Sequence, residues 1–274
     1  MSTLFHYTTL PTFLAIIQNR SVRFCELSKS NDKAEGRFIS ESLQSLMTHM
    51  KIPDYIQASV SHILERLINI YSYYGFCMTS EGDDLGQWRA YADNGRGVAI
   101  GFDLDKLVEC AKESPLSIST KVSQVRYGME EILSLVDDLL ETLRRIDVAQ
   151  NRDFWSDPEA LFRSDTQDAK ALTFTIQTFS QNCYDIKNQS FLMEKETWIT
   201  QETTFTASSF LKFFSRQNRI VPYYDVKINP DCLNCIVAGP ELDISPHDIS
   251  RVLSSWDASL ISTKVYRSVS SVRI

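Results

Sequence analysis

The sequence predicts an α+β protein in which a mixed or antiparallel sheet is built from both termini. Strand-like segments lie near both ends of the chain, a helical section lies between them, and no Gly/Ser/Pro-rich linker or internal repeat divides it. We therefore expect a single domain over residues 1–274, with a helical insertion at about 128–185.

The first part of the chain alternates between strand and helix patterns. Thr9 is a candidate N-cap for a helix that begins at Leu10, and Pro11 lies early enough in the first turn to be tolerated. Pro53 separates two helices whose apolar residues recur on one face. The expected strands are 3–8, 21–25 and 75–80, and the expected helices are 10–17, 33–50 and 54–72.

The rest of the chain is helical first and strand-rich later. Residues 129–146 carry the strongest amphipathic pattern. The run Ser156-Asp157-Pro158-Glu159 has the form of a capping box, so another helix should begin there. The expected helices are 104–113, 129–146, 166–183 and 247–254, and the expected strands are 98–102, 121–127, 197–203, 220–228, 235–238 and 263–272.

Composition and charge exclude several classes of protein. Apolar residues make up 43% and charged residues 23% of the 274 residues, unlike a disordered chain, a collagen-like fibre or a disulfide-stapled miniprotein. No stretch approaches the roughly 20 apolar residues that cross a bilayer, and the first residues lack a charged leader. We expect a cytoplasmic protein with reduced cysteines and no membrane partner. The net charge of −7 argues against wholesale coating of nucleic acid but allows a local basic groove.

Common catalytic signatures are absent from the sequence. It contains no Gly-rich phosphate loop, HExxH, GxSxG or kinase motif set. Cys232-x-x-Cys235 is a lone pair, whereas a tetrahedral zinc site needs four ligands, so two buried thiols and no metal cofactor are expected.

The first cluster suited to ligand chemistry is His6-Tyr7-Thr8, at the end of the first expected strand. A hydrogen bond from Thr8 could hold a ring nitrogen of His6. A histidine beside an aromatic residue can then hold a ribose or a flat ring. A partly buried structural histidine is the alternative.

The second cluster runs from Trp88 to Gly97, between two apolar strands. Trp88 and Tyr91 are three residues apart, so one helical turn places them on the same face. With Arg89 and two glycines, this segment suits a flat or phosphorylated ligand. The alternative is an aromatic staple over the core, followed by a glycine turn.

The third cluster is Glu194-Lys195-Glu196. Both acids point to one face if this segment is a strand, and like charges on one face cost stability. Such a pair can bind a sugar hydroxyl and stabilise a cationic transition state, whereas a solvated charge run is the alternative.

The fourth cluster interleaves basic and aromatic residues over 210–219, including Lys212 and Arg216. Base stacking combined with phosphate contact would use such a segment. Core aromatic residues with a basic outer face are the alternative.

Taken in order, these blocks resemble a bacterial domain-of-unknown-function family, over almost the whole chain. The blocks are His6-Tyr7-Thr8, Asn31-Asp32-x-x-Glu35, Trp88-x-x-Tyr91-Ala92-x-x-x-x-Gly97-Val98-x-Ile100-Gly101-Phe102-Asp103 and Glu194-x-Glu196. The family usually follows its acid pair with Trp and then Arg, whereas this chain has Thr197-Trp198.

That family in turn looks like distant kin of the ADP-ribosyltransferases, including anti-phage toxins. The resemblance implies an ADP-ribosyltransferase-like fold, NAD as co-substrate and no metal. It makes Glu196 the catalytic acid and Glu194 the residue that orients the substrate. The implied NAD-binding residues are His6, Tyr7, Thr8, Ser80, Trp88 and Tyr91, with His6 on the ribose and Tyr91 stacked on the nicotinamide.

The chemistry implied by the resemblance is mono-ADP-ribosylation of a cytoplasmic macromolecule. A fixed carboxylate stabilises the oxocarbenium-like cation that forms when the glycosidic bond breaks. RNA ranks ahead of protein as acceptor because of the basic–aromatic segment, with Arg89, Lys212 and Arg216 as target-binding residues. The resemblance also implies a toxin role in anti-phage defence, with antitoxin and chaperone proteins as partners.

Three other functions stay open from the sequence alone. One is a non-catalytic, nucleotide-sensing module of a defence complex, and another is an NAD glycohydrolase that uses water as acceptor. The third is a metal nuclease, for which Asp83-Asp84 and Asn31-Asp32-x-x-Glu35 are the only candidate clusters of oxygen ligands. Turn and capping chemistry explains those acids better.

Overall fold

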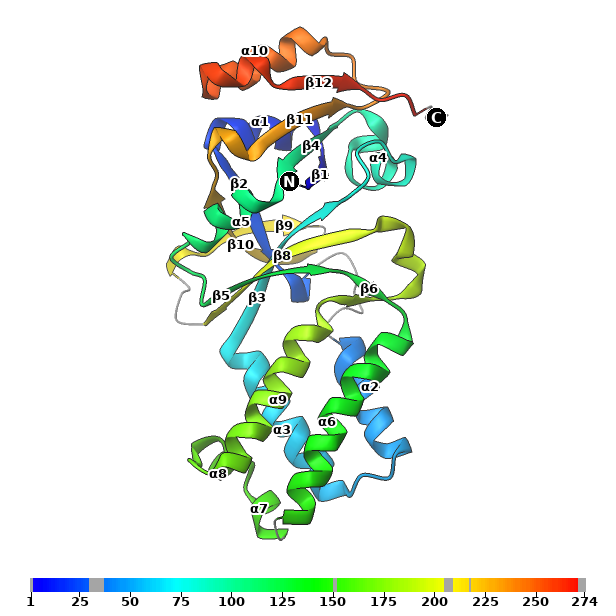
Figure 1. The fold of residues 1–274 in the computed structure, drawn as a ribbon, viewed down its shortest axis with the longest axis vertical. Helices are drawn as coiled ribbons and strands as arrows, with labels where there is room; N and C mark the ends of the chain where they lie inside the picture. The colour runs from blue at the N-terminus through cyan, green and yellow to red at the C-terminus, as the bar shows by residue number, and fades with distance from the viewer. Residues whose placement is uncertain (1, 30–36, 150–151, 205–208, 217, 271–274) are drawn as a thin grey trace.

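A sheet of ten strands lies above a body of helices in the computed structural model (Figure 1), which confirms the predicted α+β class. The structure describes residues 2–29, 37–149, 152–204, 209–216 and 218–270. No helix in these ranges is both long and apolar enough to cross a membrane.

The bounds of the strands and helices are as follows. The strands are β1 (Thr3–Thr8), β2 (Ser21–Glu26), β3 (Tyr71–Thr79), β4 (Val98–Asp103), β5 (Ser119–Gln124), β6 (Arg126–Tyr127), β7 (Ile186–Lys187), β8 (Glu196–Thr204), β9 (Lys212–Arg216), β10 (Arg219–Lys227), β11 (Leu233–Ala238) and β12 (Lys264–Arg267). The helices are α1 (Leu10–Asn19), α2 (Arg37–His49), α3 (Asp54–Ile70), α4 (Leu85–Tyr91), α5 (Leu104–Lys112), α6 (Met129–Ala149), α7 (Arg152–Ser156), α8 (Pro158–Arg163), α9 (Gln167–Cys183) and α10 (Pro246–Trp256).

The sheet branches at β3. Its main path runs β12-β11-β4-β1-β3-β2-β10-β9, while β8 pairs with β3 along its whole length and β5 pairs with β8. All of these pairs are antiparallel except β11 with β12. Strands β1 and β3 meet at a single register pair, Phe5 with Thr79, and then diverge. Strands from both ends of the chain thus build the sheet. Strands β1 and β3 are neighbours in it and separate beyond their single pair.

One hydrophobic core lies between the sheet and helices α1, α5 and α10. Phe13, Leu107 and Leu253 come from those helices, and Phe24 and Ile236 come from β2 and β11. The predicted cap of α1 is confirmed, because the Thr9 side chain accepts a hydrogen bond from the backbone N–H of Thr12.

A second core lies inside the helical body. Ile63 of α3, Leu139 of α6, Trp155 of α7 and Ile176 of α9 are all buried in it. The sequence placed the helical insertion at about 128–185, but α2 and α3 pack into the same core. The helical body is therefore assembled from two separate parts of the chain (Figure 1).

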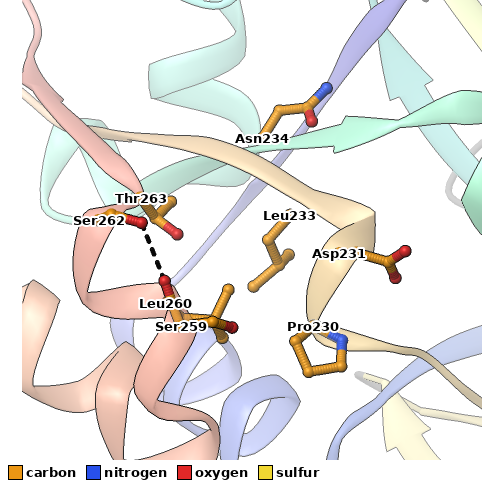
Figure 2. A pocket seen from close by; sticks show the side chains of 8 residues that line it. All are labelled: Pro230, Asp231, Leu233, Asn234, Ser259, Leu260, Ser262 and Thr263. Atoms are coloured by element: carbon orange, nitrogen blue, oxygen red, sulfur yellow. Dashed lines mark hydrogen bonds between the residues drawn. The ribbon is translucent and has the colours of Figure 1, made fainter.

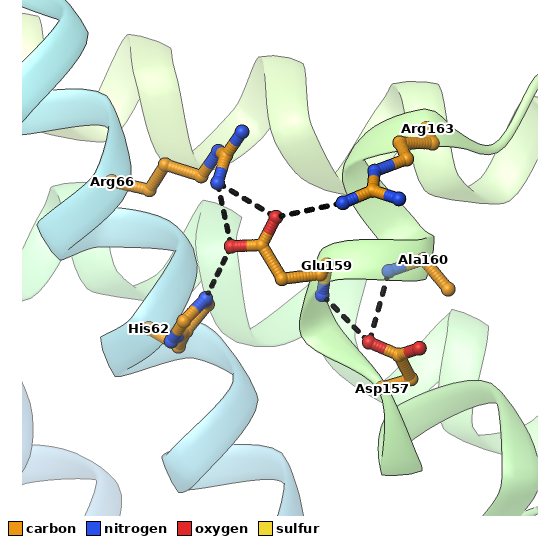
Figure 3. Close-up of polar contacts among 6 residues, drawn as sticks. All are labelled: His62, Arg66, Asp157, Glu159, Ala160 and Arg163. Carbon is orange, nitrogen blue, oxygen red and sulfur yellow. Dashed lines mark hydrogen bonds and ion pairs between the residues drawn. The ribbon is translucent and has the colours of Figure 1, made fainter.

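Polar contacts tie α8 to α3 on the outside of this body (Figure 3). Glu159 accepts two hydrogen bonds from Arg66 at 2.6 Å and lies 3.0 Å from His62. The N-cap of α8 is Asp157, which accepts from the backbone N–H groups of Glu159 and Ala160. The helix expected from the capping-box pattern is present, and Asp157 is its cap.

Some strand boundaries differ from the expected ones. Strand β3 begins at Tyr71, because residues 71–74, three of which are tyrosines, pair with β8 although they also continue the helical pattern of α3. The expected strand 121–127 is interrupted at Val125, so that residues 126–127 pair with β7 instead. Of the expected strand 263–272, residues 271–272 lie outside the described residues, and in the described part the strand is limited to β12. Strand β9 is one that the sequence did not predict.

Candidate functional site

A small cavity of about 50 Å³ lies where β1 and β3 diverge. It is lined by Phe5, His6, Tyr7, Cys77, Met78, Thr79, Gln87, Tyr91 and Glu196. A larger groove of about 490 Å³ shares His6, Tyr7 and Tyr91 with it and continues along α1 to β2, β9 and β10. The fold therefore brings His6, Tyr91 and Glu196 together from three distant parts of the chain.

His6 is fixed by its neighbour on β3. Its Nδ1 lies 2.8 Å from the carbonyl oxygen of Cys77, and its ring lies 4.4 Å from that of Phe76. A carbonyl only accepts, so Nδ1 carries the proton, and Nε2 is an acceptor in the neutral ring. Burial lowers the pKa of His6, which favours this neutral form. The expected hydrogen bond to Thr8 is replaced by the bond to Cys77, while Thr8 lines the groove.

Helix α4 places Tyr91 between the cavity and the groove. Asp84 caps the helix by accepting a hydrogen bond from the Gln87 N–H at 2.9 Å, which bears out the capping explanation of this acid. The Tyr91 hydroxyl donates to Glu194 Oε1 at 2.6 Å, and the Gln87 side chain donates to the Glu194 carbonyl at 3.1 Å. The helix and the acid segment thus hold one another in place.

Trp88 packs against the site but does not line it. It is fully buried, its indole N–H donates to Asp83 at 2.7 Å, and its ring packs edge-on against Tyr7 at 4.7 Å. This is the geometry of an aromatic staple, and Trp88 lines neither the cavity nor the groove. Ser80 is exposed just after β3, and Arg89 is exposed on α4. Neither of them lines the cavity or the groove.

The acid pair spans the end of a 3-10 helix (Gln189–Glu194) and the start of β8. Lys195, between the two acids, is left-handed with φ 45° and ψ 47°. The Tyr127 hydroxyl accepts a hydrogen bond from the Glu196 N–H at 3.0 Å. Both carboxylates reach the same ammonium group, that of Lys187. The two acids therefore meet the same lysine because the left-handed Lys195 turns the backbone between them, and not because they alternate along one strand.

Lys187 is the residue of this site that the sequence did not single out. Its Nζ lies 2.6 Å from the Glu196 carboxylate and 3.3 Å from that of Glu194. It also lies 5.1 Å from the ring centre of Trp198. Nothing in the two-residue strand β7 signals this role from sequence, because the contact forms only in the fold.

The buried acid cluster carries excess negative charge. Two carboxylates share one ammonium, so Glu194, Glu196 and Lys187 sum to about −1 when all are ionised. Burial raises the pKa of Glu196, the Lys187 ammonium opposes this rise, and the Glu194 carboxylate adds to it. A cationic ligand group at this end of the cavity would relieve the excess charge.

The other end of the groove is basic and aromatic. Arg23 lies 4.6 Å from the ring centre of Tyr223, and Arg216 lies 6.0 Å from that of Phe214. Lys212, which was expected to bind a target, forms an ion pair of 2.6 Å with Asp225. Arg216 lines the groove itself.

A separate concavity of about 510 Å³ lies beside β11 and is open to solvent (Figure 2). It is lined by Pro230, Asp231, Leu233, Asn234, Ser259, Leu260, Ser262 and Thr263. Its lining holds no cation and no aromatic ring. Asp231, the charged residue of that lining, already pairs with Lys106 at 3.1 Å. It offers fewer groups for recognition than the groove does.

Metal ligands do not gather in the part of the chain that the structure describes, where no group of three or more His, Cys, Asp or Glu could hold an ion. Cys232 is buried with its sulfur 3.6 Å from that of Cys110, and Cys235 is half-buried. Asp83 binds Trp88 and the backbone N–H of Val269. The motif Asn31-Asp32-x-x-Glu35 lies outside the described residues.

Comparison with known proteins supports only part of the family resemblance. Residues 87–199 match the model of a family described as "Protein of unknown function (DUF2971)". The match covers the segment from Trp88 to Gly97 and the acid pair, less than half of the chain, and leaves His6 outside. No curated protein and no solved structure matches the chain.

Proposed function

We propose that this protein is an NAD-dependent mono-ADP-ribosyltransferase with an ADP-ribosyltransferase-like fold. The observation that carries the proposal is that His6, Tyr91 and Glu196 line one cavity. The groove that opens from it, about 490 Å³, falls within the range of roughly 300–1,000 Å³ that is usual for ligand sites.

The order of charges along the groove supports a dinucleotide. The cavity end has excess negative charge when Glu194 and Glu196 are both ionised, and the far end carries Arg23 and Arg216. NAD has a cationic pyridinium ring at one end and a pyrophosphate further along. A ligand with this order of charges fits the groove in one direction only.

Each residue has a definite part in the proposed reaction. The unprotonated Nε2 of His6 accepts a hydrogen bond from a ribose hydroxyl, and the Tyr91 ring stacks on the nicotinamide. The bond between the ribose C1′ and the nicotinamide nitrogen breaks, and its electron pair leaves with neutral nicotinamide. The Glu196 carboxylate stabilises the oxocarbenium-like cation until the acceptor attacks C1′ and loses its proton.

The acceptor is a macromolecule, and RNA ranks ahead of protein. Strand β9 is at one end of the sheet path and carries Lys212, Arg216 and the exposed ring of Phe213. Exposed aromatic rings next to cations suit unstacked bases and phosphates. The toxin role in anti-phage defence and the antitoxin and chaperone partners rest on the family resemblance alone. The cytoplasmic location rests on the sequence expectation given above.

The test is incubation of the protein with labelled NAD and with separate RNA and protein fractions. Wild type should label RNA, and Glu196→Gln should lose transfer while keeping its melting temperature within a few degrees. Glu130→Gln, on the exposed side of α6, is the matched control. Transfer by Glu196→Gln at the wild-type rate would reject Glu196 as the catalytic acid. Label on protein alone would show that the acceptor is protein and not RNA.

A second candidate function is a non-catalytic nucleotide sensor in a defence complex. The ion pair between Lys187 and Glu196 favours it, because an internal ammonium already occupies the carboxylate that the reaction needs. NAD binding without any turnover would support the sensor. Release of free ADP-ribose without labelled macromolecule would instead indicate an NAD glycohydrolase.

A further inference from the structure

A short segment after β12 binds the loop that leads into α4. Residues 268–270 follow β12 and run toward α4 (Figure 1). The Ser268 hydroxyl donates to one carboxylate oxygen of Asp83, and the Val269 backbone N–H donates to the other at 2.8 Å. The Ser270 hydroxyl donates to the Asp83 carbonyl oxygen at 3.3 Å. Three consecutive residues thus converge on one aspartate, and we call residues 268–270 the strap.

The same carboxylate also holds the helix. The Trp88 indole N–H donates to Asp83 Oδ1 at 2.7 Å, so the strap and α4 share this oxygen. Trp88 is fully buried, and Asp84, the residue after Asp83, caps the helix. A shift of Asp83 would therefore move the start of α4 and its buried side chain together.

Helix α4 carries this position on to the cavity. Gln87 and Tyr91 line the cavity, and they donate to the carbonyl and to the carboxylate of Glu194 at 3.1 and 2.6 Å. The helix has only seven residues, and a helix of this length is not stable by itself. Its position therefore depends on the contacts made from outside it, and the strap and Asp83 supply those at its first turn.

Polar contacts hold the strap in place. The Val269 side chain is 93% exposed, and its two neighbours are serines. The Ser268 backbone N–H donates to the Ala238 carbonyl at 2.8 Å, directly after the last residue pair of β11 and β12. Surface segments held by a few hydrogen bonds open far more readily than a packed core does. The strap can therefore leave Asp83 while β12 stays paired.

We propose that the strap is a releasable control element of the cavity and that Asp83 is the positioning residue through which it acts on α4. With the strap bound, α4 holds Gln87 and Tyr91 against Glu194. With the strap released, α4 loosens and the cavity loses affinity for its ligand. This device would act on any ligand of the cavity, so it goes beyond the proposed function.

The first test needs no ligand and measures amide hydrogen exchange over residues 85–91 by mass spectrometry. Ser268→Asp places a second carboxylate against Asp83, so exchange over 85–91 should become about 10- to 100-fold faster while α1 exchanges as in wild type. Ser268→Thr keeps the hydroxyl and should behave as wild type. Ser255→Asp, at an exposed position of α10, is the matched control. Faster exchange confined to 268–270, or an equal rise in α1, overturns the proposal.

A double-mutant cycle tests whether the strap acts through Asp83. In Asp83→Asn the like charge is absent, so Ser268→Asp should speed exchange over 85–91 much less than it does in the wild-type background. An equal effect of Ser268→Asp in the two backgrounds would show that the strap does not act through Asp83, and the proposal fails.

Calorimetry with NAD connects the strap to ligand binding, and this measurement rests on the proposed function. Ser268→Asp should weaken NAD binding by about 10-fold, and Ser255→Asp should leave it unchanged. A loosened α4 with unchanged NAD affinity would contradict control of the cavity. A wild-type protein that does not bind NAD would refute the proposed function, whereas the exchange results would still decide whether the strap positions α4.

Discussion

The ammonium group of Lys187 lies 2.6 Å from the carboxylate of Glu196, and each of the two side chains is only 8% exposed. The pair is not a closed neutral unit, because Glu194 approaches the same ammonium at 3.3 Å and receives the Tyr91 hydroxyl. A single buried cation thus holds both acids near the cavity. The charge balance of the site depends on this one lysine.

Replacement of Lys187 by Met should lower the free energy of unfolding by about 3–5 kcal/mol at pH 7, because it leaves buried carboxylates uncompensated. Urea denaturation followed by circular dichroism measures this change. Lys170→Met is the control, since its ion pair with Asp165 is largely exposed and should contribute about 1 kcal/mol or less.

The same variant should respond to pH in a defined direction. Without the lysine, the pKa of Glu196 rises further, so the folded state holds a proton that the unfolded state has released. Stability should therefore fall as pH rises from about 4.5, and the destabilisation should be smaller at pH 5 than at pH 7.5. A destabilisation that does not change with pH would show that lost packing, not charge, is responsible.

Tyr91→Phe should separate the ring of Tyr91 from its hydroxyl. It removes the 2.6 Å hydrogen bond to Glu194, which should cost about 1.5–3 kcal/mol of unfolding free energy because the acceptor is charged. The ring remains for stacking, so NAD affinity should fall far less than in Tyr91→Ala. Equal NAD affinity in the two variants, measured by calorimetry, would remove Tyr91 from the stacking role.

His6 should make folding sensitive to mild acid. Because burial lowers the pKa of His6, the unfolded state takes up a proton below about pH 6.5 that the folded state does not. The contribution of His6 to stability is therefore complete above pH 6.5 and is lost as the pH falls. Urea denaturation at pH 7.5 and pH 5.5 should show a smaller loss of stability for His6→Gln than for wild type, and equal losses would contradict the assignment.

Gly97→Ala should disturb the end of β1. A Cβ atom at position 97 would lie 2.1 Å from the backbone carbonyl oxygen of Thr8, so the backbone has to move. We expect a loss of about 1–3 kcal/mol or more, together with weaker NAD binding, because His6 and Thr8 are on that strand. Gly86→Ala, whose nearest new contact is a side-chain oxygen at 3.1 Å, should have a much smaller effect on the melting temperature.

The sequence predicted elements where a local pattern determines them. The cap of α1 by Thr9 and the amphipathic helix at 129–146 follow from short-range chemistry, and both are present. Strand β9 was missed because its basic and aromatic residues remain mostly exposed on both faces, which hides the half-buried pattern of an ordinary strand.

The candidate site was predictable only in its separate pieces. His6, Tyr91 and Glu196 stand out by residue type, but Lys187 enters the site through the pairing of β6 with β7. Trp88 and Tyr91 lie one helical turn apart, yet only Tyr91 faces the cavity, and the period of a helix cannot tell which of the two packs inward. Arg23 carried no signal, because its role depends on strands β9 and β10, about 190 residues further along the chain.

Helix α3 ends at Ile70 and β3 begins at the next residue, so no loop separates the helical body from the sheet. The same strand ends at Thr79, on the floor of the cavity, two residues beyond the carbonyl that holds His6. Helix α3 and strand β3 therefore form one continuous segment that runs from the helical body to the cavity. A displacement of α3 would be passed directly to the residues of β3 that line the cavity.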